Sequence, residues 1–212
     1  MTDLWAERAQ LYVESDAHRQ GEDLDALVEW ARGARTALDV ATGGGHVARR
    51  LREEGIEVVT CDRSPGMRPD VICPAEHLPF ADGSFDVVAC RTAAHHFEDV
   101  QAAVREMARA SSGRVLIADT VNMGDAVEEA EAVRDPSHRR NYSEDEWAEI
   151  VVGAGLELRE ARLFEHSFDL QAWLERTGCV GEDAARAVQL LGDRVSDGRL
   201  TLRKIALRAE TS

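Results

Sequence analysis

The sequence has no run of apolar residues approaching the roughly 20 that a membrane-spanning helix needs. Its first ten positions, MTDLWAERAQ, carry charges where a secretory signal peptide would have its apolar segment. Basic residues are scarce as well, because 25 Lys and Arg stand against 40 Asp and Glu and give a formal charge of −15. Such a charge repels a phosphate backbone. We therefore expect a cytoplasmic protein with no membrane span and no nucleic acid as its main partner.

The cysteines and histidines of the sequence also lack the spacing that is typical of a metal site. The four cysteines form no C-x-x-C pair, and two of them stand in apolar, strand-like runs, which favours reduced thiols packed in the core. His95 and His96 are adjacent, so an extended backbone would aim their rings in different directions, and no third ligand has suitable spacing. We predict no metal site. The cysteines are Cys61, Cys73, Cys90 and Cys179.

What is present is an alternation of strand and helix patterns. Four apolar runs rich in β-branched residues are separated by helix-length segments, which is the pattern of βαβ units in a parallel sheet. With 212 residues, the chain has the size of one domain. The four runs are TALDVA (36–41), IEVVTC (56–61), FDVVAC (85–90) and RVLIAD (114–119).

Further helix and strand signals flank these runs. Apolar spacing predicts helices that end near Gly55 and Gly113, and Ser143 with Glu146 forms a capping-box pattern that begins a helix over 143–153. The segment before Ser143 is interpreted only as a charged stretch. The other predicted elements are amphipathic helices over 3–13 and 22–32, a strand over 156–165, helical pieces over 169–176 and 182–194, and a last strand near 200–208.

A glycine-rich turn follows the first run directly. Gly43–Gly45 leads from a strand into a helix, where glycine permits positive φ and the close approach of a ligand to backbone N–H groups. Asp62 closes the second run, 19 residues after Gly43, where a carboxylate can accept both hydrogen bonds of a ribose diol. The alternative role of Asp62 is to cap a turn at Ser64-Pro65. The spacing also satisfies the looser fingerprint for NAD, so the loop alone does not decide the cofactor.

Five segments of the chain follow one another as recognisable motifs. They are LDVATGGGHVA (38–48), VVTCDRSPGM (58–67), AEHLPFADGSFDVVACRTAAHHFEDV (75–100), REMARASSGRVLIADT (105–120) and DPSHRRNYSEDEW (135–147). In order and spacing they resemble the motifs of class I methyltransferases that use S-adenosylmethionine (SAM), and the similarity is closest to the group of ubiquinone and menaquinone biosynthesis methyltransferases. The resemblance implies an α/β, Rossmann-like three-layer sandwich: a mostly parallel seven-stranded sheet with an antiparallel last strand, an N-terminal helical cap and a helical insertion near the C-terminus.

The resemblance implies a single methyltransferase domain, 1–212, with an N-terminal helical cap (1–34), a SAM-binding core (35–121) and a C-terminal half (122–212). Residues 166–198 of that half are longer than the short turn typical of the minimal fold, and their apolar cluster predicts a lid on the acceptor side. Trp147 and Trp173 lie on predicted amphipathic helices, where core packing explains them better than an aromatic acceptor pocket.

Roles for individual residues follow from the resemblance by position. It implies that Asp39 anchors the glycine loop and the methionine amino end of SAM, and that Asp62 holds the ribose hydroxyls. Arg63 would border the adenine ring, a backbone N–H at Ala75-Glu76 would meet the adenine edge, and Arg91 would lie beside the methionine end. The implied cofactor-binding set is Asp39, Ala41, Gly43, Gly44, Gly45, Asp62, Arg63, Ala75, Glu76 and Arg91.

Two positions depart from the family pattern. Ala41 stands where the loop usually has its first glycine, and we expect a mild effect because alanine is nearly as small. Pro74 stands where many members place an aspartate that bonds the adenine amino group, so a donor and a carboxylate are missing. The lost adenine contact is worth about 1 kcal/mol, unless Glu76 or another group substitutes for it.

Methyl transfer needs a nucleophile held close and aligned, and a proton acceptor where the nucleophile is a hydroxyl. His96 follows the third run at the carboxyl edge of the predicted sheet, and His18 and His138 lie in segments that would border the acceptor. These three histidines are the candidate bases, and the alternative for His96 is a role in fixing its loop. His46 opens the first helix, where it would point away from the cofactor or border it, and receives no chemical role.

The sequence thus predicts a methyltransferase that moves a methyl group from SAM to an unidentified small-molecule acceptor and releases S-adenosylhomocysteine (SAH). One alternative is an NAD(P)-binding Rossmann oxidoreductase, although the chain has no candidate Tyr-x-x-x-Lys pair and its only lysine is Lys204. The other is a non-catalytic SAM-binding subunit, which the Pro74 departure and the lack of an unambiguous base motivate.

Overall fold

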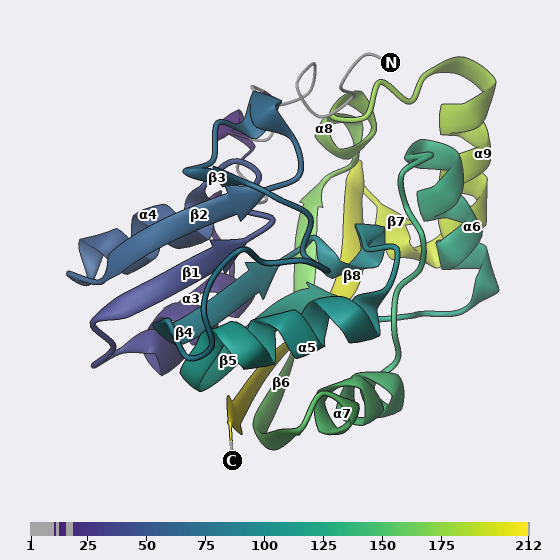
Figure 1. The fold of residues 1–212 in the computed structure, drawn as a ribbon. Coiled ribbons are helices and arrows are strands. Elements are labelled where there is room, and N and C mark those ends of the chain that lie inside the picture. The colour runs from purple at the N-terminus through teal and green to yellow at the C-terminus, as the bar shows by residue number, and fades with distance from the viewer. Residues whose placement is uncertain (1–10, 12, 16–18, 212) are drawn as a thin grey trace.

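The computed structural model describes residues 11, 13–15 and 19–211, which form a sheet with helices on both faces (Figure 1). The strand order is β3-β2-β1-β4-β5-β8-β6, and the short β7 pairs with β8 outside this path. Strands β1 to β5 pair in parallel, whereas β8 is antiparallel to β5 and β6. The predicted fold class is confirmed. The strands are β1 (Thr36–Val40), β2 (Glu57–Asp62), β3 (Val71–Ile72), β4 (Phe85–Arg91), β5 (Ser111–Thr120), β6 (Leu156–Asp169), β7 (Val195–Ser196) and β8 (Arg199–Thr211).

The helices agree with most of the predicted ranges. The helix expected over 22–32 is α3, and the one expected over 143–153 is α7, whose capping box between Ser143 and Glu146 is present. The helix expected over 3–13 lies almost entirely outside the described residues. None of the helices in the described ranges is long and apolar enough to cross a membrane. The helices are α3 (Glu22–Ala31), α4 (His46–Glu53), α5 (Val100–Ala110), α6 (Asp125–Arg134), α7 (Glu144–Gly153), α8 (Leu170–Glu175) and α9 (Gly181–Leu191), with short 3₁₀ turns η1 (Pro65–Met67), η2 (Ala94–His96) and η3 (Gly192–Arg194).

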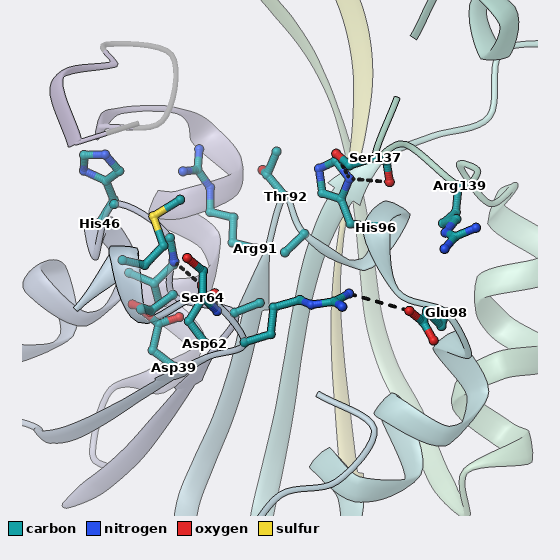
Figure 2. A pocket seen from close by; sticks show the side chains of 18 of the residues that line it. Asp39, His46, Asp62, Ser64, Arg91, Thr92, His96, Glu98, Ser137 and Arg139 are labelled. Carbon is teal, nitrogen blue, oxygen red and sulfur yellow. Dashed lines mark hydrogen bonds and ion pairs between the residues drawn. The ribbon is translucent and has the colours of Figure 1, made fainter. Parts of the chain in front are cut away.

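The strand order reverses between β1 and β4, because β2 continues the sheet on one side and β5 on the other. Open α/β sheets bind ligands at the carboxyl ends of strands beside such a reversal. A cavity opens at that place, and Asp39 of β1, Asp62 of β2 and Arg91 of β4 line it (Figure 2). The topology therefore brings together three side chains that are far apart along the chain.

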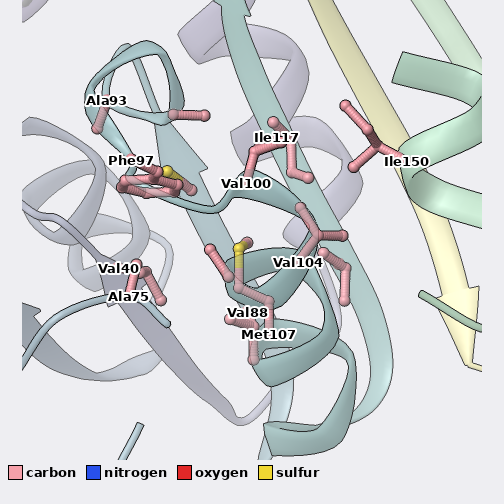
Figure 3. Packing of buried hydrophobic residues seen from close by; sticks show 14 of the residues in the cluster. Val40, Ala75, Val88, Ala93, Phe97, Val100, Val104, Met107, Ile117 and Ile150 are labelled. Carbon is pink, nitrogen blue, oxygen red and sulfur yellow. The ribbon is translucent and has the colours of Figure 1, made fainter. Parts of the chain in front are cut away.

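Both faces of the central strands are covered, which explains why their sequences are almost continuously apolar. On one face, Leu38 and Val88 pack in a cluster with Val104 of α5 and Trp147 of α7 (Figure 3 shows part of it). On the other face, Ala37, Val87 and Leu116 pack with apolar residues of α3 and α4. The four cysteines are buried and unpaired, as expected of reduced core thiols. Trp147 is fully buried, which confirms its packing role.

Two expectations about local structure were wrong. Helix α5 ends at Ala110 rather than near Gly113, which lies inside β5. A Cβ at Gly113 would come within 3.0 Å of the Asp86 carbonyl oxygen, so glycine here allows the close approach of β4 rather than ending a helix. The charged stretch after β5 contains a further helix, α6, whose apolar side is small and includes Val127 and Ala130.

Helices α6, α8 and α9 gather at the end of the molecule beside β8 (Figure 1). Their apolar side chains form a third cluster around Trp173 and Leu174, which is separate from the two clusters on the sheet. Trp173 is buried there, and the Arg134 guanidinium lies 4.4 Å from its ring centre. The apolar residues at 168–174 that suggested a lid therefore pack into this small helical unit.

Candidate functional site

The main cavity has a volume of 470 Å³, within the range of small-molecule pockets. In Figure 2, Asp39, His46, Asp62 and Ser64 lie on one side of the view, and His96, Ser137 and Arg139 on the other. The first group comes from the strand ends and the glycine loop, whereas Ser137 and Arg139 belong to the loop after α6. The 135–147 segment therefore reaches the cavity, as its resemblance to family members suggests.

Asp39 holds the glycine loop from inside the sheet. Its Oδ2 accepts hydrogen bonds from Thr42 Oγ1 at 2.6 Å and from the Ala48 backbone N–H at 3.1 Å. These contacts tie the loop to the end of β1 and to the first turn of α4. Gly43 and Gly45 have φ angles of 49° and 73°, which glycine adopts without strain. A Cβ at Gly43 would meet only the Ala41 oxygen at 4.0 Å, so the loop leaves open space for a ligand's close approach.

Asp62 supports the same loop from β2. Its Oδ2 accepts a hydrogen bond from the Gly43 N–H at 3.0 Å, and its Oδ1 accepts one from the Ser64 N–H at 2.9 Å. The second contact is the turn-capping role that the sequence left open. Because each carboxylate oxygen can accept two hydrogen bonds, the capping contacts do not preclude binding of ribose hydroxyls. Asp62 lines the cavity and is 8% exposed.

We expected a mild effect at Ala41 because alanine is nearly as small as glycine. The unusual feature of Ala41 is instead its backbone conformation. Its φ of 53° lies in the left-handed region, which costs a residue with a Cβ roughly 1 kcal/mol. Glycine adopts this conformation freely but loses about 0.5–1 kcal/mol more entropy on folding. We therefore expect Ala41→Gly to be neutral or to raise the free energy of unfolding by up to about 0.5 kcal/mol in urea denaturation.

The matched control for that variant is Ala37→Gly, in the strand that Ala41 directly follows and outside the positive-φ region. It should destabilise the protein by at least about 1 kcal/mol, because it adds chain entropy to the unfolded state and removes a buried methyl group. Equal destabilisation by the two variants would contradict the strain at Ala41.

Burial raises the pKa of Asp39 to about 6, even though its hydrogen bonds to Thr42 and Ala48 oppose the shift. The folded carboxyl thus binds a proton more readily than the unfolded one, whose pKa is near 3.9. Its contribution to stability is present below pH 4 and is lost as the pH rises through 6. We expect the stability of the wild type relative to Asp39→Asn to fall by roughly 3 kcal/mol between pH 4 and pH 7. Urea denaturation of both proteins across this range checks it, and a pH-independent difference would contradict the shift.

Arg91 belongs to a buried ionic cluster at the floor of the cavity. Its Nε donates to Asp23 Oδ2 at 2.7 Å and its second terminal nitrogen (Nη2) to Asp23 Oδ1 at 2.9 Å. Lys204 of β8 shares the same carboxylate through a contact of 3.1 Å. The side chains of Arg91, Asp23 and Lys204 are 3%, 1% and 6% exposed. Asp23 lies on α3, so this cluster fixes that helix against the end of β4 and the interior of β8.

The adjacent histidines have different environments. His95 Nδ1 lies 2.6 Å from Asp119 Oδ1. Burial alone would lower the pKa of His95, but the Asp119 carboxylate outweighs it and raises the pKa. His96 Nδ1 lies 3.1 Å from the carbonyl oxygen of Ser137, which can only accept, so Nδ1 carries the proton and Nε2 the lone pair. Burial and the neighbouring His95 lower the pKa of His96 to about 3, so His96 is neutral near pH 7.

The other sequence-predicted residues lie as follows. Arg63 lines the cavity and forms a 3.8 Å ion pair with Glu98 across it. Ala75 and Glu76 lie outside its lining, and Glu76 accepts a hydrogen bond from the Glu98 N–H at 3.0 Å. His138 also lies outside the lining, with Nε2 3.2 Å from Glu128. His46 borders the cavity, which is one of the two positions expected for it. His18 lies outside the described residues.

Sequence reasoning missed several residues of the site. Asp23, Thr92 and Asp119 had no motif to mark them, because each meets its partner only through the folded sheet. Asp119 ends the fourth run, so its place at the carboxyl edge was the one available signal. Thr92 has a φ of 54°, which is unusual for a β-branched residue, and it stands directly after Arg91 at the edge of the cavity.

Comparison with known proteins agrees with this geometry. A family model described as a methyltransferase domain matches residues 38–117. The uncharacterized methyltransferase YcgJ of Bacillus subtilis is 28% identical over 221 residues, covering 93% of this chain and 87% of the relative. The demethylmenaquinone methyltransferase of Beutenbergia cavernae is 39% identical over 108 residues, covering 45% of this chain and 44% of that protein.

Solved structures extend the similarity to the whole fold. The crystal structure of Bacillus subtilis YcgJ has a TM-score of 0.80 at 26% identity, and covers 89% of this chain and 97% of its own. That of a putative methyltransferase from Bacillus halodurans has a TM-score of 0.79 at 29% identity, and covers 90% and 99%. The chain thus carries a match to a methyltransferase domain over residues 38–117 and resembles methyltransferases along nearly its whole length, as its sequence motifs indicated.

Proposed function

We propose that this protein binds SAM in the 470 Å³ cavity and transfers its methyl group to a small-molecule acceptor, releasing SAH. The observation that carries the proposal is the pair of aspartates, Asp39 and Asp62, that hold a glycine loop open at the carboxyl ends of β1 and β2. The residues fit the cofactor, because backbone N–H groups, a carboxylate and open space beside Gly43 face the same cavity.

Within that site, Asp62 would accept hydrogen bonds from the ribose hydroxyls, and Arg63 would border the adenine ring. Gly43 and Gly44 line the cavity and would pass close to the methionine moiety. Arg91 would set the methionine end through its backbone, because its guanidinium is committed to Asp23. The roles implied for Ala75 and Glu76 would require adenine to extend beyond the main cavity, toward the exposed groove that Glu76 borders.

When bound, SAM would supply an electrophilic methyl group on a sulfonium, which an acceptor nucleophile would take while the sulfur keeps the electron pair of the broken sulfur–carbon bond. The protein positions the acceptor and accepts its proton where the acceptor is a hydroxyl. His96 is our candidate for that base, because it lines the cavity and is neutral near pH 7, so its Nε2 carries a lone pair. Its pKa of about 3 makes it a weak base, which suits an acceptor whose own hydroxyl is acidic. His18 and His138 are weaker candidates, the second because it lies outside the lining.

We also propose that residues 1–34 cap the cofactor-binding core over 35–121, and that the C-terminal half, 122–212, supplies the acceptor side. The helical unit of α6, α8 and α9 borders that side, which makes it the region expected to select the acceptor. A small-molecule acceptor and a cytoplasmic location complete the proposal. The acidic formal charge of −15 supports an acceptor other than nucleic acid.

Isothermal titration calorimetry of the full chain with SAH, SAM and NAD tests the cofactor. We expect SAM and SAH to bind with micromolar affinity and NAD at least 100-fold more weakly. Tight NAD binding without SAM binding would instead support an oxidoreductase. Release of SAH in the presence of an acceptor panel then separates an enzyme from a non-catalytic binding subunit, since the latter would bind SAM without turnover.

A further inference from the structure

A second, smaller cavity of 50 Å³ adjoins the first, and Thr92 and His96 line both. His95, which follows β4 in η2, and Thr120 of β5 also line the second cavity. A water molecule occupies about 30 Å³ in the liquid, so this space admits a group as small as a hydroxyl. The two spaces therefore meet where a hydroxyl group of the acceptor could face the second cavity while its oxygen still faces the first.

Asp119, at the end of β5, holds His95 at the wall of the second cavity. Asp119 Oδ2 accepts a hydrogen bond from the His95 backbone N–H at 3.1 Å, and Asp119 Oδ1 lies 2.6 Å from His95 Nδ1. Burial raises the pKa of Asp119, but His95 and Lys204 outweigh it and lower the pKa, so the carboxyl is ionised near pH 7. Because a carboxylate only accepts hydrogen bonds, Nδ1 carries the ring proton of neutral His95 and Nε2 carries the lone pair.

The lone pair on His95 Nε2 is available to a ligand. Nε2 forms no hydrogen bond with any residue in the described ranges, yet packing does not seal it off, and the side chain is 12% exposed. The rings of His96 and His138 lie with their centroids 4.1 and 5.5 Å from that of His95, so the imidazole has little room to turn. A proton acceptor needs such a fixed nitrogen within hydrogen-bond reach of the group that it deprotonates.

Charged groups from several elements face His95 and oppose one another. Burial lowers the pKa of His95, as does Arg134, but Asp119 and Glu131 outweigh them and raise it. His96, in contrast, has a pKa of about 3, so His95 is the stronger base of the two. The titratable and charged groups around His95 are Asp119 of β5, Glu131 and Arg134 of α6, His96 of η2, His138 of the following loop and Lys204 of β8.

Thr92 places a second hydroxyl at the junction of the cavities. Its Oγ1 accepts a hydrogen bond from Lys204 Nζ at 3.0 Å, which leaves its own O–H to donate. The Lys204 ammonium already has a carboxylate partner, because it lies 3.1 Å from Asp23 Oδ2. The Thr92 backbone keeps its left-handed φ of 54° while its N–H donates to the Ala118 carbonyl oxygen at 2.7 Å. An acceptor oxygen at the junction would thus receive a hydrogen bond from Thr92 and donate its own proton toward His95.

We propose that the methyl acceptor reacts through a hydroxyl group and that His95, held by Asp119, takes the proton of that hydroxyl. As the hydroxyl oxygen forms its bond to the methyl carbon, the sulfur keeps the electron pair of the broken sulfur–carbon bond and the proton moves to His95 Nε2. Asp119 stays ionised and stabilises the imidazolium. His96 suits only acidic hydroxyls, whereas His95 extends the site to hydroxyls of ordinary acidity. This inference rests on the proposed function.

The test uses the full chain saturated with SAH and titrated with phenol and with anisole, which lacks the O–H. We expect phenol to bind at least tenfold more tightly than anisole at about pH 9. The preference should disappear toward about pH 5, because a protonated His95 has no lone pair to offer. Isothermal titration calorimetry across this range measures it.

Variants locate the proton acceptor. His95→Gln should lose the pH dependence and most of the preference, with less than a twofold change in SAH affinity. Asp119→Asn should move the midpoint of the pH profile downward, because it removes the carboxylate that raises the pKa of His95. A residue that only supported the fold would not move this midpoint. His77→Gln is the matched control: His77 is exposed, lies outside the lining of both cavities, and its replacement should leave the profile unchanged.

Equal binding of phenol and anisole by the wild type, binding of neither, or a preference independent of pH would overturn the inference without recourse to any variant. A preference that survives in a folded His95→Gln protein but is lost in His96→Gln would also overturn it, by assigning the proton to His96. Titration with SAH alone separates the two proposals. A chain that fails to bind SAH contradicts the proposed function, whereas one that binds SAH without preferring phenol contradicts only this inference.

Discussion

Replacing Asp23 with alanine should destabilise the protein by about 3–5 kcal/mol, because it leaves two buried cations without their shared carboxylate. Arg91 and Lys204 both contact Asp23 at 3.1 Å or less. Burial raises the pKa of Asp23, but these two cations outweigh it and hold the pKa well below its usual range. The loss is of the same order as the whole stability of many domains. Urea denaturation at pH 7 measures it.

A matched control lies two residues further along the same helix. Asp25 pairs with Arg50 at 2.9 Å, but its side chain is 63% exposed, so Asp25→Ala should cost less than about 1 kcal/mol. A similar small loss for Asp23→Ala would show that water or rearrangement compensates the buried cations.

Replacing Asp62 with alanine should lower the affinity for SAH at least 100-fold, which corresponds to about 2.7 kcal/mol. The variant removes the acceptor expected for the ribose hydroxyls, and hydrogen bonds to a charged group are worth about 1.5–3 kcal/mol each. It also removes the partner of the Gly43 and Ser64 N–H groups, which loosens the glycine loop. Isothermal titration calorimetry measures the change.

Asp70→Ala provides the comparison, because Asp70 is also a turn aspartate near β2 that accepts backbone and side-chain hydrogen bonds from Thr60. It lies outside the cavity lining. Its replacement should alter SAH affinity less than threefold while costing some stability. Unchanged affinity in a folded Asp62→Ala protein would mean that the carboxylate only caps the turn at Ser64 and that the ribose binds elsewhere.

Local patterns predicted most of the fold because they act within a few residues. β-Branched runs fall on the central strands, and Ser143 with Glu146 marks the start of α7. Helix α6 was missed because its apolar side is short, and its stability depends on packing against α9. Gly113 was misjudged because a stop signal for a helix and a close approach between strands both favour glycine, and only the position of β4 distinguishes them.

In the candidate site, too, some features depend on local sequence patterns and others on tertiary packing. The sequence itself determined the glycine loop, the aspartates at the ends of β1 and β2 and the resemblance to methyltransferases, because these depend on short motifs whose spacing is fixed by strand and turn geometry. The tertiary structure decided the rest. Arg91 and Asp23 are 68 residues apart and Lys204 and Asp23 are 181 apart, so no local pattern could pair them. The buried ionic cluster exists only where α3, β4 and β8 pack together, because buried charges acquire their partners, and their energies, through long-range packing.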